Sequence, residues 1–471
     1  MSRPARTAAN PRAPRPARGR GGGVSANAPK PPQRDRLIQA MIELAARLGY
    51  QNVSVAQLSA HAGVSSATFY QQFDGKEECL LEAYRVVAAR MFERMQPVAA
   101  EAVSSDGEWA REARAALGRL LSAVQQDPNG ARVLYFEPLA AGSRMLEQRR
   151  RVLEEFERRA ENFLLSTPAD GSRLDLPAMA LMGAMRSIVS RRLRANAEDE
   201  IPELASDLVA WVESYATAPG RKPWSTGPNA LLPATRATKR PATRDAQAQA
   251  PGRLPRGRHG LPVGVVARSQ RTRVIYGTAQ VMMSKGYANA TVADIVAAAG
   301  VARDVFYEHF TDKHHAFLEA QQHPTHFILD ACSAAYFSGE VWPERMWNGL
   351  STLIELIVQH PALSHLRLIE CYAAGPTATR RAEDITRSFT IFLEEGYRYR
   401  PEASELPRLC SQAIGGAIFE VVQRHVARRD YDGLRRQLPQ LTYVAIAPFT
   451  GAENAASLVE ELSARSARRR K

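Results

Sequence analysis

GVSSATFYQQFDGKEECL, residues 63–80, decides the fold, because a related string, GVARDVFYEHFTDKHHAFL, follows at residues 300–318 of the same 471-residue chain. Around these strings, residues 34–85 and 271–322 align without a gap, and every pair keeps one offset (286 − 49 = 237). A constant register over the whole segment indicates one supersecondary unit that has been duplicated. The chain therefore consists of two related halves.

Helix signals open the first copy. Apolar residues recur at helical spacing over 34–48, and Gly49 follows as a C-terminal glycine that ends a helix. Ser54 then stands at the N-cap of a short helix, and Gly63 makes a tight turn after it. The pattern therefore predicts a bracing helix followed by a short one.

A second short helix comes directly after this turn. Ser65 caps it, the pair Asp74-Gly75 forms the next turn, and Lys76 opens a longer helix. Two short helices joined by a glycine turn and braced by a preceding helix make a helix-turn-helix. The second copy repeats this plan with an N-cap, a turn and an opening lysine of its own: Thr291, Gly300 and Lys313.

Both strings resemble the helix-turn-helix of the TetR family of bacterial transcriptional repressors. The family pattern is a Gly-Val turn, a short recognition helix ending in aromatic-Tyr-x-x-Phe, and a lysine at the start of the fourth helix, and both copies satisfy it. The resemblance implies an all-α protein of two TetR-like halves. Each half is expected to carry an N-terminal helix-turn-helix head on a helical body that binds a small-molecule effector and forms dimers.

The bodies are duplicated as well. Glu137–Gly142 parallels Glu370–Gly375, and Gly183-Ala184 parallels Gly416-Ala417, at a single offset (375 − 142 = 233). The predicted domains are a disordered basic arm, head 1, body 1, a disordered basic linker, head 2, body 2 and a basic tail, at residues 1–33, 34–85, 86–216, 217–268, 269–322, 323–464 and 465–471.

Positive charge is concentrated outside the predicted domains. The chain carries a net charge of +13, to which the arm, linker and tail contribute +7, +9 and +5, leaving −8 for the rest (13 − 21). Flexible basic segments attract nucleic acid through a salt-sensitive term that is blind to sequence, although solubilising linkers have the same composition. Four scattered cysteines, no secretion signal and no apolar run of membrane-spanning length predict a cytoplasmic, nucleoid-associated protein without membrane contact.

The recognition helix of head 1 carries small hydroxyl and amide side chains that are suited to reading base edges: Ser65, Ser66, Thr68, Gln71 and Gln72. Tyr70 is expected to reach a phosphate through its hydroxyl, with a core position as the alternative. Lys76 adds positive charge at a helix N-terminus, which itself attracts phosphate. Ser54 caps a helix where the DNA backbone is expected to pass.

Head 2 departs from head 1 on the same surface. Its candidate DNA contacts are Thr291, Arg303, Tyr307, His309 and Lys313. Asp304 and Glu308 would repel phosphate, although an acid can accept a hydrogen bond from cytosine. Head 2 is therefore expected to read a different half-site or to bind it weakly. Pro324 falls within the expected fourth helix and should kink or shorten it.

Chemistry other than DNA binding has little support in the sequence. A histidine cluster, His314, His315, His323 and His326, lacks a recognisable metal-ligand spacing, so neither a metal nor a cofactor is expected. No catalytic dyad, nucleophile elbow or phosphate loop is present. Aromatic and methionine residues of the bodies could line a ligand pocket, but residues of these types belong more often to the core.

The sequence therefore favours a sequence-specific transcriptional regulator, expected to act as a repressor, whose binding to double-stranded operator DNA responds to a small-molecule effector. The alternative is a helical small-molecule-binding protein or enzyme with vestigial heads. We expect the two halves to pair within the chain as a pseudo-dimer, through helices near 144–165, 201–216, 378–396 and 433–446. The rival arrangement is a homodimer of tandem chains.

Overall fold

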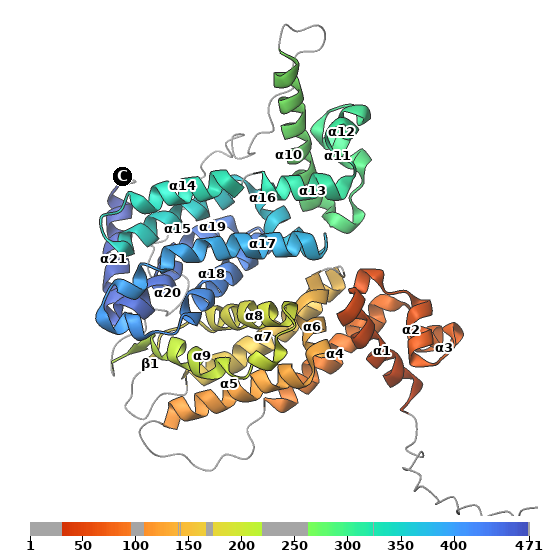
Figure 1. The fold of residues 1–471 in the computed structure, drawn as a ribbon, viewed down its shortest axis with the longest axis horizontal. Coiled ribbons are helices and arrows are strands. Elements are labelled where there is room, and N and C mark those ends of the chain that lie inside the picture. Colours follow the sequence, from red (N-terminus) through yellow and green to blue (C-terminus); the bar gives the residue numbers. More distant parts are fainter. Residues whose placement is uncertain are drawn as a thin grey trace, which may run out of the picture.

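The computed structural model describes residues 31–95, 108–139, 141, 143–165, 173–218, 262–323 and 325–469. Within these ranges the chain folds almost entirely into helices, and the strands there are two short ones, β1 (Arg173–Leu174) and β2 (Ala216–Thr217), paired antiparallel. The prediction of an all-α protein is confirmed. Figure 1 shows two small heads on a larger helical mass formed by the two bodies.

The two heads have the same helix order. Head 1 contains α1 (Gln33–Leu48), a 3₁₀ turn (Tyr50–Asn52), α2 (Val55–Ala62), α3 (Ser66–Gln72) and the start of α4 (Lys76–Arg94). Head 2 contains α10 (Val263–Asn289), α11 (Val292–Ala299), α12 (Arg303–His309) and α13 (Lys313–Gln322). The two heads have separate buried cores, which include Phe69 and Phe73 in one and Phe306 and Phe310 in the other, and each core continues into the adjoining body.

Body 1 consists of α5 (Glu108–Gln126), α6 (Pro128–Phe136), a 3₁₀ turn (Glu137–Leu139), α7 (Ser143–Leu165), α8 (Ala178–Arg194), a 3₁₀ turn (Glu198–Glu200) and α9 (Leu204–Glu213). Body 2 begins with α14 (Thr325–Phe337), α15 (Trp342–Gln359), α16 (Pro361–His365), a π-helical turn η5 (Leu366–Glu370) and α17 (Pro376–Ser388). Three 3₁₀ turns (Phe389–Leu393, Gly396–Arg398 and Pro401–Glu405) lead to α18 (Leu409–Ala427), α19 (Tyr431–Arg436), α20 (Leu438–Thr450) and α21 (Ala452–Arg469).

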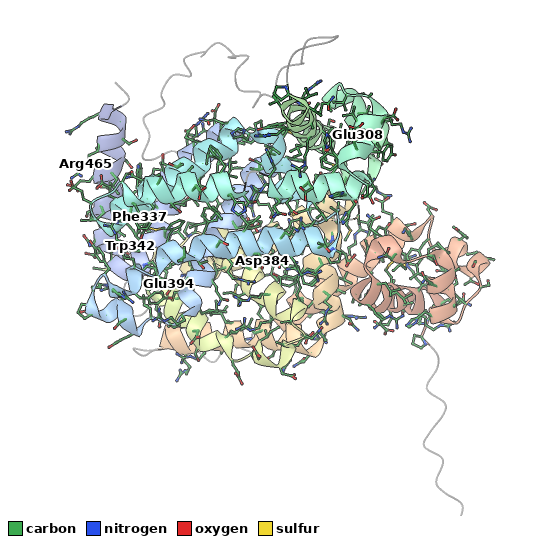
Figure 2. The ribbon with its side chains drawn as sticks, turned by 45° about the horizontal axis from the view of Figure 1, so that its top comes forward. Glu308, Phe337, Trp342, Asp384, Glu394 and Arg465 are labelled. Carbon is green, nitrogen blue, oxygen red and sulfur yellow. The ribbon has the colours of Figure 1, made fainter. Side chains whose placement is uncertain are left out.

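Helices extend into the predicted linker and into the predicted tail. α10 begins at Val263, inside the range 217–268, directly after Pro262 at its N-cap. α21 continues to Arg469, with Arg465 and Glu461 paired at 3.8 Å across one turn, so the basic tail is largely helical. It lies at the end of the molecule away from both heads (Figures 1 and 2). Residues 1–30 and 219–261 lie outside the described ranges.

The expected fourth helix of head 2 is short. α13 ends at Gln322 and α14 begins at Thr325, whereas its counterpart in head 1, α4, continues unbroken to Arg94. Pro324 itself lies outside the described residues. Head 2 is therefore joined to its body through two consecutive helices, whereas head 1 is joined through one.

The two bodies share a single hydrophobic core, which runs from α5, α8 and α9 into α15, α18 and α20. The central contact is between α8 and α18, and neither helix lies in the ranges expected to pair. Leu208 and Trp211 of α9 and Leu441 and Val444 of α20, which were expected at the interface, are buried in the same core. The expected ranges thus contain flanking helices and omit the central pair.

Glycine allows α8 and α18 to touch backbone to backbone. A Cβ atom on Gly183 would lie 2.8 Å from the Gly416 carbonyl oxygen, and one on Gly416 would lie 2.9 Å from the Gly183 carbonyl oxygen. The next turn of each helix closes the contact with Ser187 and Glu420, which occupy equivalent positions (420 − 187 = 233). Reciprocal contacts of this kind are the property of a two-fold interface.

Polar groups brace this interface on both sides. Tyr215 donates through its buried hydroxyl to the Val444 carbonyl oxygen at 2.7 Å. Arg424 of α18 pairs with Glu157 of α7, with Nη1 and Oε2 3.0 Å apart, and Arg186 of α8 pairs with buried Glu420 of α18. Burial raises the pKa of Glu420, but the guanidinium groups of Arg186, Arg149 and Arg424 outweigh it and hold that pKa below its usual value.

Replacing Gly183 by alanine tests the close contact. The added methyl group should clash with α18 and lower the free energy of unfolding by about 1–3 kcal/mol, although alanine favours helix. Gly118 of α5 is the matched control, because a Cβ there meets nothing within 4 Å. Gly118→Ala should raise stability by up to about 1 kcal/mol. Denaturant unfolding of both variants measures the difference, and equal effects would argue against a tight α8–α18 contact.

Candidate nucleic-acid interface

Local hydrogen bonds build the helix-turn-helix of head 1. Ser54 and Gln57 form a capping box at the start of α2, in which the Gln57 amide donates to Ser54 Oγ at 3.2 Å and the Ser54 amide to Gln57 Oε1 at 2.8 Å. Gly63 ends α2 in the left-handed conformation with φ 63°, which favours glycine. Ser65 Oγ accepts from the Thr68 amide at 3.0 Å and caps α3. Ser54 and Ser65 thus fill the capping positions expected of them.

Arginines of the first helix hold the turn in place. Arg36 donates from Nη1 to the Ala62 carbonyl oxygen at 2.9 Å, and the equivalent Arg273 donates to the Gly300 carbonyl oxygen at 2.9 Å. Arg34 donates to the Gln72 carbonyl oxygen at 2.6 Å and stacks on the Phe73 ring. Sequence reasoning missed these residues, although the matching of Arg34 and Arg36 with Arg271 and Arg273 in the two copies was a usable signal.

α3 presents most of the predicted contacts on its outer face. Phe69 and Phe73 are buried, whereas Tyr70 between them is 61% exposed. The core alternative for Tyr70 is therefore wrong. Ser65, Ser66 and Gln71 are exposed, and Thr68 and Gln72 are half-buried. The predicted residues are thus at least partly accessible beside the exposed Tyr70 side chain, and their role as DNA contacts remains a prediction.

The same face of α12 in head 2 has a different charge pattern. Tyr307 is 47% exposed, and Arg303, Asp304 and Glu308 are also exposed, with His309 half-buried. Figure 2 shows Glu308 on the outer side of head 2. Ala302 occupies the N-cap without a side-chain bond, whereas Thr291 caps α11 with Asp294. Head 2 thus keeps the helix order of head 1 but carries acids where head 1 has uncharged residues, with Asp304 in place of Ala67 and Glu308 in place of Gln71.

The opening lysine of α4 bonds within the head. Lys76 Nζ donates to the carbonyl oxygens of Tyr50, Gln51 and Val53 at 3.4, 3.3 and 3.1 Å and lies over the Tyr50 ring. Lys313 makes the equivalent bonds in head 2, at 3.0–3.5 Å. These bonds use all three ammonium hydrogens, so a phosphate contact through Lys76 Nζ would have to replace one of them.

One carboxylate from each body reaches into the head above it. Glu137 Oε2 accepts from the Tyr50 amide at 2.7 Å, and Glu370 Oε2 accepts from the Tyr287 amide at 2.7 Å. Both amides follow a glycine of positive φ: Gly49 ends α1, and Gly286 forms a kink within α10. We call this bond the head–body link. It joins the element that precedes the helix-turn-helix directly to the body in both halves.

The link in the first half is buried. Burial raises the pKa of Glu137 to about 7, and the hydrogen bond from the Tyr50 amide opposes that rise. In the second half His365 lies beside Glu370, with Nε2 and Oε1 3.3 Å apart. The two links therefore share a geometry and differ in the ionisable groups that surround them.

Two segments of the chain, residues 37–83 and 274–320, match the model of the bacterial regulatory proteins, tetR family. Both heads belong to the TetR family. The chain is thus a tandem TetR-family protein, in which the segment that this family model describes occurs twice. The matches cover the helix-turn-helix of each head and the bracing helix before it.

Solved structures of TetR-like regulators resemble parts of the chain. The fatty acid degradation regulator FadR from Bacillus halodurans is 20% identical, with a TM-score of 0.35 over 38% of this chain and 94% of that one. FadR from Bacillus subtilis in complex with stearoyl-CoA is 18% identical, with a TM-score of 0.33 over 37% and 96%. A TetR family regulator from Marinobacter aquaeolei VT8 is 17% identical, with a TM-score of 0.29 over 43% and 96%. No curated protein matches the chain.

The described residues of this TetR-family chain include neither a membrane-spanning helix nor a cluster of metal ligands. No helix among them is long and apolar enough to cross a membrane. The same part of the chain holds no group of three His, Cys, Asp or Glu side chains arranged to bind a metal ion. All four cysteines are buried free thiols.

Substitutions of Lys76 and Tyr70 should distinguish a residue that stabilises the head from one that is free to contact DNA. Lys76→Ala removes three charge-assisted hydrogen bonds and should lower the free energy of unfolding of the protein by about 1.5–3 kcal/mol. Tyr70→Phe removes an exposed hydroxyl and should leave it unchanged. Thermal denaturation of the wild-type protein and both variants measures the differences in stability. A Lys76→Ala protein of unchanged stability would show that these bonds contribute nothing and would restore Lys76 as a free phosphate ligand.

The buried Glu137 carboxyl should give stability a pH dependence. Its pKa is raised on folding, so between about pH 4.5 and 7 the folded state binds a proton that the unfolded state has released. Its contribution to stability therefore falls as pH rises through this window. Glu137→Gln keeps an acceptor for the Tyr50 amide and should flatten the fall. Melting temperatures of both proteins across the window measure the effect, and identical profiles would exclude Glu137 as its source.

Proposed function

We propose that the chain is a sequence-specific DNA-binding regulator that presents two heads from one polypeptide and whose DNA affinity responds to a small molecule. The reciprocal contact of Gly183 and Gly416 carries this proposal, because it joins the bodies across a pseudo-two-fold axis. Both heads then lie toward the same end of the joined bodies (Figure 1). A single head reads only a half-site, so paired heads are the arrangement that an operator requires.

The exposed face of α3 supplies the proposed contacts of head 1. Ser65, Ser66, Thr68 and Gln71 are assigned to base edges, and Tyr70 to a phosphate. In head 2, Arg303 and Tyr307 are assigned to DNA beside the acids Asp304 and Glu308. Because these surfaces differ, the proposed operator is an imperfect palindrome. Repression is the expected direction of regulation.

Effector control is supported by the two cavities in the bodies. Body 2 contains an apolar cavity of about 140 Å³ and body 1 an equivalent one of about 50 Å³. In each body the cavity is lined by the helix that leads to the head–body link, with Leu134 and Tyr135 in one and Ser364 and Leu368 in the other. A ligand in the cavity is therefore one or two helical turns from the bond that holds the head.

DNA binding is tested by gel shift with the DNA upstream of the gene, in a salt series and against unrelated DNA of equal length. The wild-type protein should prefer the upstream fragment, and Tyr70→Phe and Tyr307→Phe should each weaken that complex, because both heads contribute a phosphate contact. Weakening by only one variant would assign binding to one head. No preference at any salt concentration would favour the alternative, a small-molecule-binding protein or enzyme with vestigial heads.

The oligomeric state tests pairing within the chain. The tether keeps the halves at an effective concentration on the order of millimolar, which favours the intramolecular pair. Light scattering should therefore give a mass near the 51.9 kDa of one chain. A mass near twice 51.9 kDa at micromolar concentration would instead support a homodimer of tandem chains with four heads.

A further inference from the structure

The cavity in body 2 contains one charged side chain. Its walls are mainly apolar and include Leu350, Leu353, Ile357 and Phe389, but Arg367 of the π-helical turn also lines it. Arg367 is 8% exposed, and its Nη1 atom is buried without a hydrogen-bond partner. A buried guanidinium without a partner is unfavourable, because charges inside proteins are normally paired or hydrogen-bonded. The cavity thus holds a positive charge that lacks a counterion.

The remaining polar groups of this cavity are already engaged. Ser364 donates to the Ile357 carbonyl oxygen at 3.1 Å, Thr386 to that of Ala382 at 3.0 Å and Thr390 to that of Arg387 at 2.7 Å. Tyr336 donates to Glu395 at 2.7 Å. No aspartate or glutamate lines the cavity in the part of body 2 that the structure describes. Arg367 is therefore the group that can donate strong hydrogen bonds to a ligand.

Body 1 supplies an internal comparison at the same place. Leu134 stands where body 2 has Arg367 (367 − 233 = 134), and Arg149 stands where body 2 has Ala382 (382 − 233 = 149). Both Leu134 and Arg149 line the smaller cavity. Arg149 also has a terminal nitrogen without a hydrogen-bond partner, but Glu157 and Glu420 line the same cavity and supply negative charge. The uncompensated cation is therefore specific to body 2.

We propose that the body 2 cavity binds an amphiphile with one carboxylate, which pairs with Arg367, and an apolar body, which fills the space between α14, α15, α17 and α18. A guanidinium can hold a carboxylate through two parallel hydrogen bonds, and the apolar walls reject a second charge. A cationic ligand is excluded by the same positive charge. The assignment deepens the proposed effector control and rests on it.

The position of Arg367 connects this ligand to head 2. Arg367 lies three residues before Glu370 on the same π-helical turn, and Glu370 accepts from the Tyr287 amide at 2.7 Å in the head–body link. Single π-helical turns are uncommon in proteins, and those that occur are frequently located at functional sites. The equivalent stretch of body 1, α6, has no such turn. A carboxylate that draws Arg367 into the cavity therefore acts on the segment that holds head 2.

Calorimetry on the full chain without DNA tests the ligand class. The probes are straight-chain saturated fatty acids of increasing length and the n-alkanols of the same lengths, all below the concentration at which micelles form. The acids should bind, with affinity rising about fourfold per methylene until the cavity is full. Alkanols of the same length should bind at least about tenfold more weakly, because they lack the charge that Arg367 recognises.

Arg367→Leu identifies the residue responsible. Body 1 carries leucine at the equivalent position, so the variant should fold, and thermal denaturation checks this. The Arg367→Leu substitution should reduce the affinity for the acids to that for the alkanols, whereas Arg367→Lys should keep part of the preference for acids. Arg398→Leu is the matched control, because it removes one exposed arginine from the same body outside the cavity. It should leave binding of both series unchanged.

Three results would overturn the proposal: no acid of any length binds, acids and alkanols bind wild-type protein equally, or folded Arg367→Leu keeps the preference for acids. Gel shift of the same preparations separates this failure from failure of the proposed function. If the protein does not bind the acids but still forms a sequence-selective complex with DNA, only the ligand assignment is contradicted. Acid binding through Arg367 without any DNA preference contradicts the DNA-binding function alone.

Discussion

The close approach of Gly183 and Gly416 is the constraint on which the rest of the structure depends. Each glycine faces the carbonyl oxygen of the other, so neither position has room for a side chain. This approach allows α8 and α18 to merge the cores of both bodies into one, with Arg186 and Glu420 paired directly beside it. Because the bodies are fixed to each other, the heads that they carry are also confined to one end of the molecule. The geometry of a potential DNA interface thus originates in two residues that lie in the bodies and outside both heads.

Each head is joined to its body both by apolar packing and by a small set of polar contacts. Glu137 and Glu370 accept the backbone amides of Tyr50 and Tyr287, and on the other side of the same peptide segments Lys76 and Lys313 bind carbonyl oxygens. The short segment between the first two helices is therefore held from the body by a carboxylate and from the fourth helix by an ammonium group. A displacement of either partner would change the position of the helix-turn-helix as a unit. This makes the segment the natural point at which events in the body reach the head.

The heads could be predicted from the sequence because their signals are local. Gly63 at the turn and Ser65 at the N-cap each fix a feature within a few residues, and the structure confirms both. The placement of Lys76, Arg36 and Glu137 could not be predicted, because side chain-to-backbone bonds between distant elements leave no periodic trace. The interface helices α8 and α18 were missed for a related reason. Their small residues permit close packing only against the helix that faces them, and the sequence does not show which helix that is. Only the matching of Gly183 with Gly416 across the two copies hinted at their role.

Duplication within one chain explains where the two halves agree and where they differ. A homodimer must present identical heads and identical cavities, whereas a tandem chain can change one copy alone. The shared positions are structural: the interface glycines, the head–body carboxylates and the arginines that brace the turns are present in both halves. Differences occur at positions proposed to contact DNA or a ligand, with Ser66 replaced by Arg303, Gln71 by Glu308 and Leu134 by Arg367. Because the common scaffold holds both heads regardless of these changes, the proposed effector control would allow one half to sense a ligand that the other does not bind, with the response reaching a single pair of heads.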